Sequence, residues 1–155
     1  MRLHTYPEDS VLIKNCRDVV EFDGIMNKAV QMYKIMIDNN GVGLAAPQVG
    51  MDINMFIVHP ERCIPEKLVR PVYINPRIVY IEEGIEAMFS MQEGCLSIPN
   101  RRYAINRPDH IIVSAQDSNG NRFEVEADGW YARVLQHEID HLDGVLINGA
   151  RGMKL

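Results

Sequence analysis

The sequence predicts an α+β fold in which antiparallel sheets pack around a central helix, with another helix near the N-terminus. Apolar residues recur at helical spacing in two segments, one before residue 40 and one after residue 128. Between them, from Ile53 to about Val125, short runs rich in β-branched and aromatic residues are bounded by Pro, Gly and Asn, which is typical of strands. Consecutive strands flanked by separate helices favour α+β over alternating α/β architecture.

The first helix is expected from about Asp23, which can cap it, to Asn39, where Asn39-Asn40-Gly41 offers a stop. We expect its core-facing residues to be Met26, Ala29, Val30, Tyr33, Met36 and Ile37. The segment from Gly41 to Gly50 holds three glycines and a proline, so it is expected to be a loop.

Six strands are expected in the middle of the chain, and Asn119-Gly120 is a hairpin turn signal between the last two. The expected strands are Ile53–Val58, Val72–Ile74, Ile78–Ile81, Ala87–Met91, His110–Ala115 and Phe123–Val125.

The second helix is expected from about Gly129 to Leu142, with Asp128 as its cap and an end near Gly144. A short strand over Val145-Leu146-Ile147 is expected to follow. The helix should be surrounded by protein, because apolar residues lie on more than one of its faces: Trp130, Ala132, Val134, Leu135, Ile139 and Leu142.

Length and composition predict one soluble globular domain over residues 1–155, because the chain is 46% hydrophobic and 24% charged. No apolar run approaches the ~20 residues of a membrane-spanning helix, and the first residues lack the apolar stretch of a secretory signal. A net charge of -5 disfavours direct nucleic-acid binding. Three cysteines, an odd and sparse set, favour a reducing compartment, so we expect a cytoplasmic protein.

Residues His137 to His141 read His-Glu-Ile-Asp-His, which predicts a metal site on the second helix. Two imidazoles four positions apart project from one helix face and can grip one ion, while Glu138 can reach a metal-bound water as a general base. A third ligand could be any Cys, His, Asp or Glu. Cys95 stands out because it lies in the segment Glu93-Gly94-Cys95-Leu96-Ser97-Ile98-Pro99, whereas Cys16 and Cys63 are expected to be small buried residues.

The segment Gly41-Val42-Gly43-Leu44-Ala45-Ala46-Pro47-Gln48 is a weak signal when taken alone. It lacks the basic residue of a nucleotide phosphate loop. Its small residues allow close backbone contact with a ligand, and Gln48 offers a neutral amide that can donate a hydrogen bond.

Together these three segments closely resemble the peptide deformylase family, which is marked by a G-x-G-L-A-A-x-Q loop, an E-G-C-L-S strand and a Q-H-E-x-D-H helix. The early Tyr6-Pro7-Glu8-Asp9, with Arg102 and Arg107, also looks like the family, so the resemblance covers essentially the whole chain. It implies that Cys95, His137 and His141 bind the metal and that Glu138 is the base. It also implies that Gln48 and the backbone N–H of Leu96 stabilise an oxyanion.

The activity implied by the resemblance is metal-dependent hydrolysis of a linear formamide. The formyl group of formyl-methionine would be removed from nascent polypeptides and released as formate. One divalent ion per chain is implied, with Fe²⁺ as the physiological metal and Zn²⁺, Ni²⁺ or Co²⁺ able to occupy the site. Transient ribosome association is a further expectation. Family members often carry a C-terminal helix or tail, whereas only Gly149 to Leu155 follow the last expected strand here.

The resemblance also places residues around the substrate, although plain core packing is an equal interpretation for four of them, Val42, Met91, Trp130 and Val134. Arg133 is expected to bury its stem while its charge stays in water. The backbone of Val42-Gly43 and of Glu93-Gly94 can pair with an extended peptide as an added strand. Asp140 is expected to face away from the metal, toward solvent, a metal ligand or Arg107.

Two other classes remain as alternatives. A zinc peptidase shares the His-Glu-x-x-His pattern but usually takes a third ligand downstream, and only 14 residues follow His141. A structural metal module would normally use four protein ligands and would need neither Glu138 nor Gln48.

Overall fold

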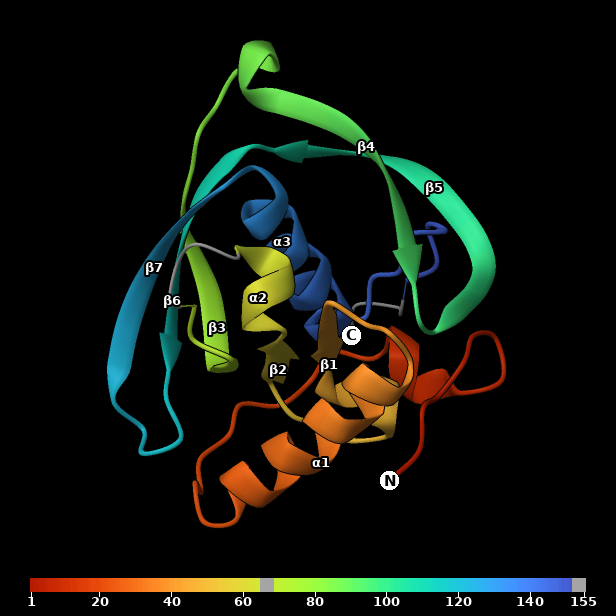
Figure 1. The fold of residues 1–155 in the computed structure, drawn as a ribbon, viewed down its shortest axis with the longest axis vertical. Helices are drawn as coiled ribbons and strands as arrows, with labels where there is room; N and C mark the ends of the chain where they lie inside the picture. Colours follow the sequence, from red (N-terminus) through yellow and green to blue (C-terminus); the bar gives the residue numbers. More distant parts are fainter. Residues whose placement is uncertain (65–68, 152–155) are drawn as a thin grey trace.

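The computed structural model describes residues 1–64 and 69–151 and confirms the α+β prediction. Helix α3 (Gly129–Leu142) lies at the centre with strands around it, and helix α1 (Ile25–Asp38) packs at one end (Figure 1). A short helix, α2 (Pro60–Cys63), lies beside α3. The strands are β1 (Gly43–Ala45), β2 (Met55–Val58), β3 (Val72–Ile81), β4 (Met88–Cys95), β5 (Ile98–Pro108), β6 (His110–Gln116) and β7 (Arg122–Asp128).

Two antiparallel sheets form the layers around α3. Five strands pair in the order β1-β2-β3-β6-β7, and β4 pairs with β5 as a separate ribbon. The main core lies between the five-stranded sheet and α3, where Phe56, Tyr73 and Leu135 are fully buried. The long β4–β5 ribbon curves over the other side of α3 (Figure 1).

The prediction for α1 is right in extent and only partly right in orientation. Its N-cap is Gly24 rather than Asp23. Met26, Val30 and Ile37 are exposed, although Ala29 and Met36 are buried as predicted. The buried stripe is Ile25, Ala29, Met32 and Met36. The predicted set joins parts of this stripe to a neighbouring apolar stripe of the same spacing, and only contact with β1 and β2 decides which one packs inward.

Several strand predictions are corrected. The expected Gly41 to Gly50 loop contains β1 and a 3₁₀ turn, Ala46–Val49. The two strands expected over residues 72–81 are one strand, with irregular pairing to β6 between Ile74 and Arg77. β4 continues past its expected end at Met91 and ends at Cys95, and β5 was not predicted. The sequence does not reveal β5 because most of its residues are exposed, so it lacks a clear alternation of apolar and polar positions.

The turn prediction and the two ends predicted for α3 are confirmed. Gly120, with φ +81°, lies in the turn between β6 and β7. Asp128 occupies the N-cap position of α3, although its side chain makes no capping hydrogen bond. At the other end Gly144 is left-handed, and the N–H of Val145 donates to the Asp140 carbonyl at 2.8 Å, which closes the helix.

The C-terminal segment is only partly described. The strand expected at residues 145–147 is reduced to one isolated bridge between Val145 and Arg151, and residues 152–155 lie outside the described residues. Within residues 1–64 and 69–151, no helix is long and apolar enough to cross a membrane.

Candidate metal centre and its cleft

The three predicted ligands meet where the end of β4 contacts α3. Cys95 is the last residue of β4, and His137 and His141 lie one turn apart on α3. One ligand atom from each lies within 4.8 Å of the other two. Cys95 Sγ is 3.3 Å from His141 Nε2. A thiolate and two imidazoles form a donor set that suits a dication of borderline softness, and three protein ligands leave a coordination position for water or substrate.

Glu93 orients the His137 ring through a hydrogen bond, a role that the sequence did not predict. The Glu93 side chain is only 4% exposed. Its Oε1 accepts a hydrogen bond from His137 Nδ1 at 2.9 Å, which leaves Nε2 of the ring as the ligand atom. Arg107 donates two hydrogen bonds to the carboxylate, at 2.7 and 2.9 Å, and Arg133 donates one at 2.6 Å. In the sequence, the only indication of this role for Glu93 was strand alternation, which places residues 93 and 95 on the same face of β4.

The electrostatics of this cluster favour a positive charge beside Cys95. Burial would raise the pKa of Glu93, but hydrogen bonds from His137, Arg107 and Arg133 and the charge of Arg107 lower it to about 2. Burial would likewise lower the pKa of His137, but hydrogen bonds with Cys95 and Glu93 and the charge of Glu138 raise it to about 10. The residues present therefore fit a bound cation, which would take the place of the proton.

Glu138 lies against the cluster with one oxygen available for chemistry. The residue is 4% exposed, and among the described residues its Oε2 has no hydrogen-bond partner although it is buried. Burial raises the pKa of Glu138 to about 7 despite the opposing charges of His137 and Arg107. Gly43 makes room for this side chain, since a Cβ at Gly43 would lie 2.8 Å from the Glu138 carboxyl carbon. A carboxylate with such a pKa is suited to exchanging protons near neutral pH.

Gln48 directs its amide nitrogen toward the same place. Its side chain is buried, and its Oε1 accepts a hydrogen bond from the Ala45 N–H at 2.9 Å. That contact fixes the amide so that Nε2 faces Ser97 Oγ at 3.1 Å and Cys95 Sγ at 3.7 Å. Ser97 is fully buried, and nothing in the sequence assigned it a role.

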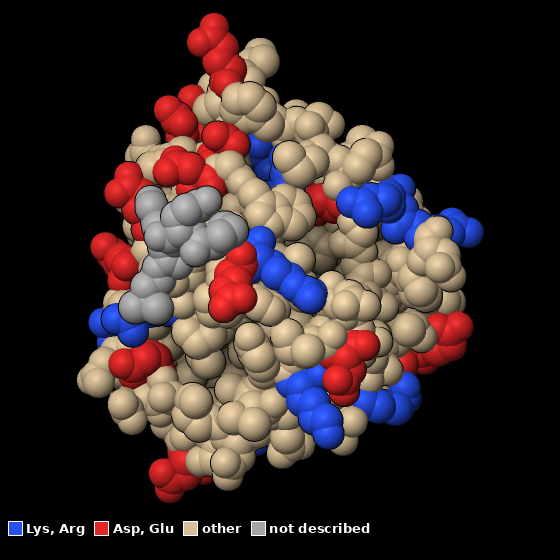
Figure 2. Space-filling model, in the orientation of Figure 1, with Lys and Arg blue, Asp and Glu red and all other residues tan. Residues whose placement is uncertain are grey.

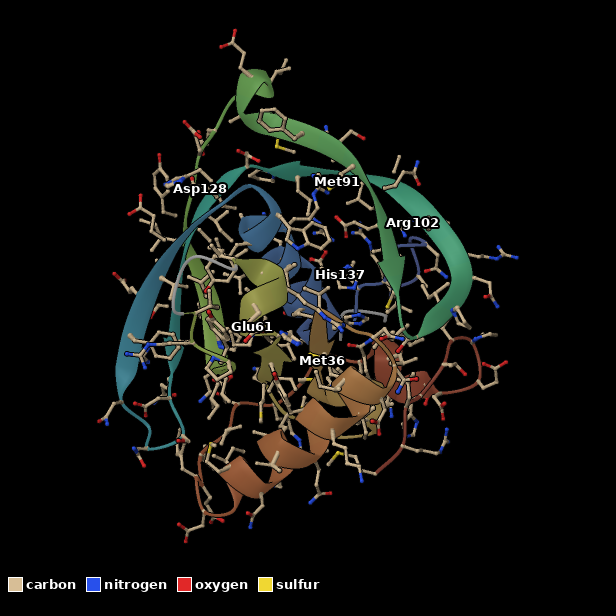
Figure 3. All side chains as sticks on the ribbon, in the orientation of Figure 1. Met36, Glu61, Met91, Arg102, Asp128 and His137 are labelled. Atoms are coloured by element: carbon tan, nitrogen blue, oxygen red, sulfur yellow. The ribbon has the colours of Figure 1, made fainter. Side chains whose placement is uncertain are left out.

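A cleft of about 800 Å³ opens over these residues. Figure 2 shows a hollow in the surface in the region where Figure 3 places His137. Met91, which was also predicted to lie beside the substrate, is 45% exposed and is not among the residues that line this cleft. The predicted residues that do line it are Val42, Gly43, Gln48, Glu93, Gly94, Cys95, Leu96, Trp130, Arg133, Val134, His137 and Glu138.

Two other predictions about charged residues are settled by their contacts. The charge of Arg133 does not stay in water: its guanidinium is buried against Glu93 and donates to the carbonyls of Ile105 and Phe89, at 2.9 and 2.6 Å. Three fixed acceptors offset the free-energy cost of removing the guanidinium from water. Asp140 forms the ion pair with Arg107, at 2.7 Å, which was one of its three predicted environments.

The remaining cysteines form no disulfide, and their environments partly match the prediction. Cys63 is buried, whereas Cys16 is half-buried. Burial raises the pKa of each thiol to about 12, so both are protonated at neutral pH.

Comparisons with known proteins agree with the sequence resemblance. Residues 1–151 match the family model of polypeptide deformylase. A peptide deformylase of Borreliella burgdorferi is 42% identical over 147 residues, which cover 94% of this chain and 84% of the relative. Peptide deformylase 1 of Clostridium perfringens is 40% identical over 142 residues and covers 91% of each chain.

Solved structures show the same fold. The crystal structure of peptide deformylase from Thermotoga maritima has a TM-score of 0.84 and 37% identity, and the match covers 99% of this chain and 97% of that one. The structure from Thermus thermophilus has a TM-score of 0.81 and 39% identity, covering 94% and 81%. With its whole described length, its fold and its ligand cluster accounted for in this way, the chain belongs to the polypeptide deformylase family of enzymes.

Proposed function

We propose that this protein removes the N-formyl group from formyl-methionine at the start of nascent polypeptides and releases formate, and that residues 1–155 form one catalytic domain. The observation that carries the proposal is the buried Glu138 oxygen, which has no hydrogen-bond partner among the described residues and lies beside three convergent candidate metal ligands. The donor set fits one divalent ion per chain. We infer Fe²⁺ as the native metal, with Zn²⁺, Ni²⁺ or Co²⁺ able to replace it.

The chemistry of the residues suits a formamide, which is a poor electrophile. A bound dication supplies Lewis acidity and lowers the pKa of water toward ~7. Glu138 accepts the proton of the attacking water and returns it to the leaving amine, a role supported by its pKa of about 7. The Nε2 of Gln48 and the N–H of Leu96 donate to the oxygen on which negative charge develops. Glu93 keeps His137 in its ligating orientation.

The substrate would bind as an added strand. β1 is an edge strand of the five-stranded sheet, and among the described residues β4 pairs only with β5. Backbone groups at Val42 and Gly43 on one side, and at Glu93 and Gly94 on the other, line the cleft between these edges. An extended peptide can hydrogen-bond to such edges.

The methionine side chain would occupy the apolar part of the cleft. Val42, Trp130 and Val134 line this part, and the Trp130 ring is held by a hydrogen bond from Nε1 to the Arg62 carbonyl at 3.1 Å. A peptide deformylase from Synechococcus elongatus with a TM-score of 0.81 has been solved in complex with actinonin. We therefore expect actinonin to bind this cleft as well. The proposed setting is the cytoplasm, in transient association with ribosomes.

Release of formate from formyl-Met-Ala-Ser tests the proposal against its alternatives. We expect turnover with this peptide and none with acetyl-Met-Ala-Ser, whose blocking group is one carbon larger. A zinc peptidase would instead cut internal bonds of unformylated peptides, and a structural metal module would act on neither. If the protein releases no formate with any of Fe²⁺, Zn²⁺, Ni²⁺ and Co²⁺ bound, the proposal is refuted.

A further inference from the structure

Residues 3–6, which we call the N-terminal strap, run beside the cleft and contact the backbones of Gln48 and Ser97. We propose that this strap positions the Gln48 amide for catalysis, with the backbone N–H groups of His4 and Tyr6 as its points of attachment. The inference rests on the proposed function, because it concerns the donor that would stabilise the oxyanion.

The attachments are two backbone hydrogen bonds. The N–H of His4 donates to the carbonyl of Gln48 at 2.7 Å, and the N–H of Tyr6 donates to the carbonyl of Ser97 at 3.0 Å. Gln48 and Ser97 are also joined through their side chains, Nε2 to Oγ, at 3.1 Å. The strap therefore links the backbones of the same two residues whose side chains meet beside Cys95. This closed arrangement fixes the separation of the two backbones and with it the direction of the amide.

The strap is itself held at several points. Asp9 accepts a hydrogen bond from the Thr5 N–H at 3.1 Å, and its other carboxylate oxygen lies 2.9 Å from His4 Nδ1. The His4 ring packs so closely on Gly50 that a Cβ there would lie 2.7 Å from Nε2. Tyr6 packs against the buried Leu12 cluster. An ordinary mobile terminus would lack these contacts.

The position of Gln48 explains why such a strap would matter. Gln48 belongs to a 3₁₀ turn of four residues, Ala46–Val49, and no long helix or strand fixes its backbone. An oxyanion donor contributes only when it points at the position that the charge will occupy, and a misplacement of about 1 Å can lower the rate about 10²-fold. A smaller displacement, with the Ala45 and Ser97 contacts kept, should lower kcat about tenfold.

The substitution His4→Pro removes the N–H that donates to Gln48, while His4→Ala keeps it and removes only the ring. On formyl-Met-Ala-Ser, His4→Pro should lower kcat about tenfold with KM changed less than twofold, and His4→Ala should lose at most about threefold. Because the strap would act through Gln48, adding His4→Pro to a Gln48→Leu variant should cause no further loss of kcat. Metal content and melting temperature, measured for each variant, show that the site and the fold are retained.

Equal losses in His4→Pro and His4→Ala, or fully additive losses in the double variant, would overturn the inference. If His4→Pro does not fold, Asp9→Ala is used in its place, because this substitution removes the acceptor for the Thr5 N–H. The loss of kcat caused by Asp9→Ala must also vanish in the Gln48→Leu background. Proton exchange at the Gln48 side-chain amide, followed by NMR, gives a readout independent of turnover. It should be about tenfold faster in His4→Pro, and an unchanged rate would contradict the strap. If wild-type protein shows no turnover, the proposed function fails, while amide exchange still decides whether the strap orders Gln48.

Discussion

Glu93, Arg107 and Arg133 are buried charged residues that support the proposed metal ligand His137 and lie outside the candidate ligand cluster. Each of the two arginines donates to the Glu93 carboxylate, and Arg107 also pairs with Asp140 on α3. A buried charge that loses its partner is strongly destabilising, by about 3–5 kcal/mol, so the cluster persists only as a complete set. Glu138, the proposed base, differs from them because one of its buried oxygens has no partner among the described residues.

The first prediction at this scale concerns that oxygen. Glu138→Gln keeps the size of the side chain but removes its capacity to accept a proton. It should lower kcat at least about 10²-fold while metal content stays near one ion per chain. Formate release and metal analysis on the same preparation measure both quantities. Glu124→Gln, an exposed position on β7, is the matched control and should retain wild-type activity. A Glu138→Gln protein that is purified without metal and regains full activity when metal is added would instead mark Glu138 as a ligand.

The second prediction concerns the cysteines. Enzyme loaded with Fe²⁺ without oxygen should be the most active form and should decay in air as Cys95 is oxidised toward sulfinic and sulfonic acid. Cys16 and Cys63 should stay largely unmodified, since burial raises the pKa of both thiols to about 12 and keeps them protonated. Mass spectrometry of air-inactivated protein distinguishes the three sites, and zinc-loaded protein is the control because Zn²⁺ has no redox chemistry. Intact Cys95 with retained iron after inactivation would rule out this route.

At the scale of elements, the site depends on close packing between β1 and α3. β1 is only three residues long, yet its register with β2 places Gly43 directly against Glu138. On the opposite side, alternation along β4 directs both Glu93 and Cys95 toward α3. The helix thus presents its His-Glu-x-x-His face to two separate sheets.

The prediction for this packing is that Gly43→Ala destabilises the protein. The added methyl group would meet the Glu138 carboxyl group, and overpacking of this kind typically costs about 1–3 kcal/mol. We expect the melting temperature to fall by several degrees, with a loss of kcat from displaced Glu138. Gly94→Ala is the matched control for stability, because the nearest atom to its Cβ would be 3.9 Å away. An equal fall in melting temperature for both variants would contradict the packing argument.

At the scale of the whole molecule, the ligand cluster joins the two layers of the fold. Cys95 belongs to the β4–β5 ribbon, whereas His137 and His141 belong to the helix that packs on the five-stranded sheet (Figure 1). A bound ion would connect these layers directly, in a place where among the described residues no disulfide does so. Metal affinity and folding stability should therefore be linked.

Removal of the metal tests that linkage. A ligand present at 100 times its Kd stabilises the folded state by about 2.7 kcal/mol, which corresponds to about 5–10 °C in a chain of this length. A chelator should lower the melting temperature by this amount, and one equivalent of Zn²⁺ or Fe²⁺ should restore it. A Cys95→Ala variant should respond much less to the chelator. An unchanged melting temperature in the wild-type protein would show that metal binding does not stabilise the fold and would contradict this prediction.

The sequence alone determined the parts of the structure that depend on neighbouring residues. The extents of α1 and α3, the turn at Gly120 and the shared face of His137 and His141 follow from local periodicity, glycine conformation and helical spacing. The family resemblance added Cys95 to the ligand set, and the structure brings it to the histidines.

Only the tertiary structure decided the features that join distant segments. The inward face of α1, strand β5, the support of His137 by Glu93 and the exposure of Met91 all depend on which residues of other elements lie opposite. Arg133 is buried for the same reason: its charge is stabilised by Glu93 and two carbonyl groups from the β4–β5 ribbon. The physical cause is that the free energy of a buried polar group depends on partners fixed by the packing of the chain, and residue spacing along the sequence does not specify them.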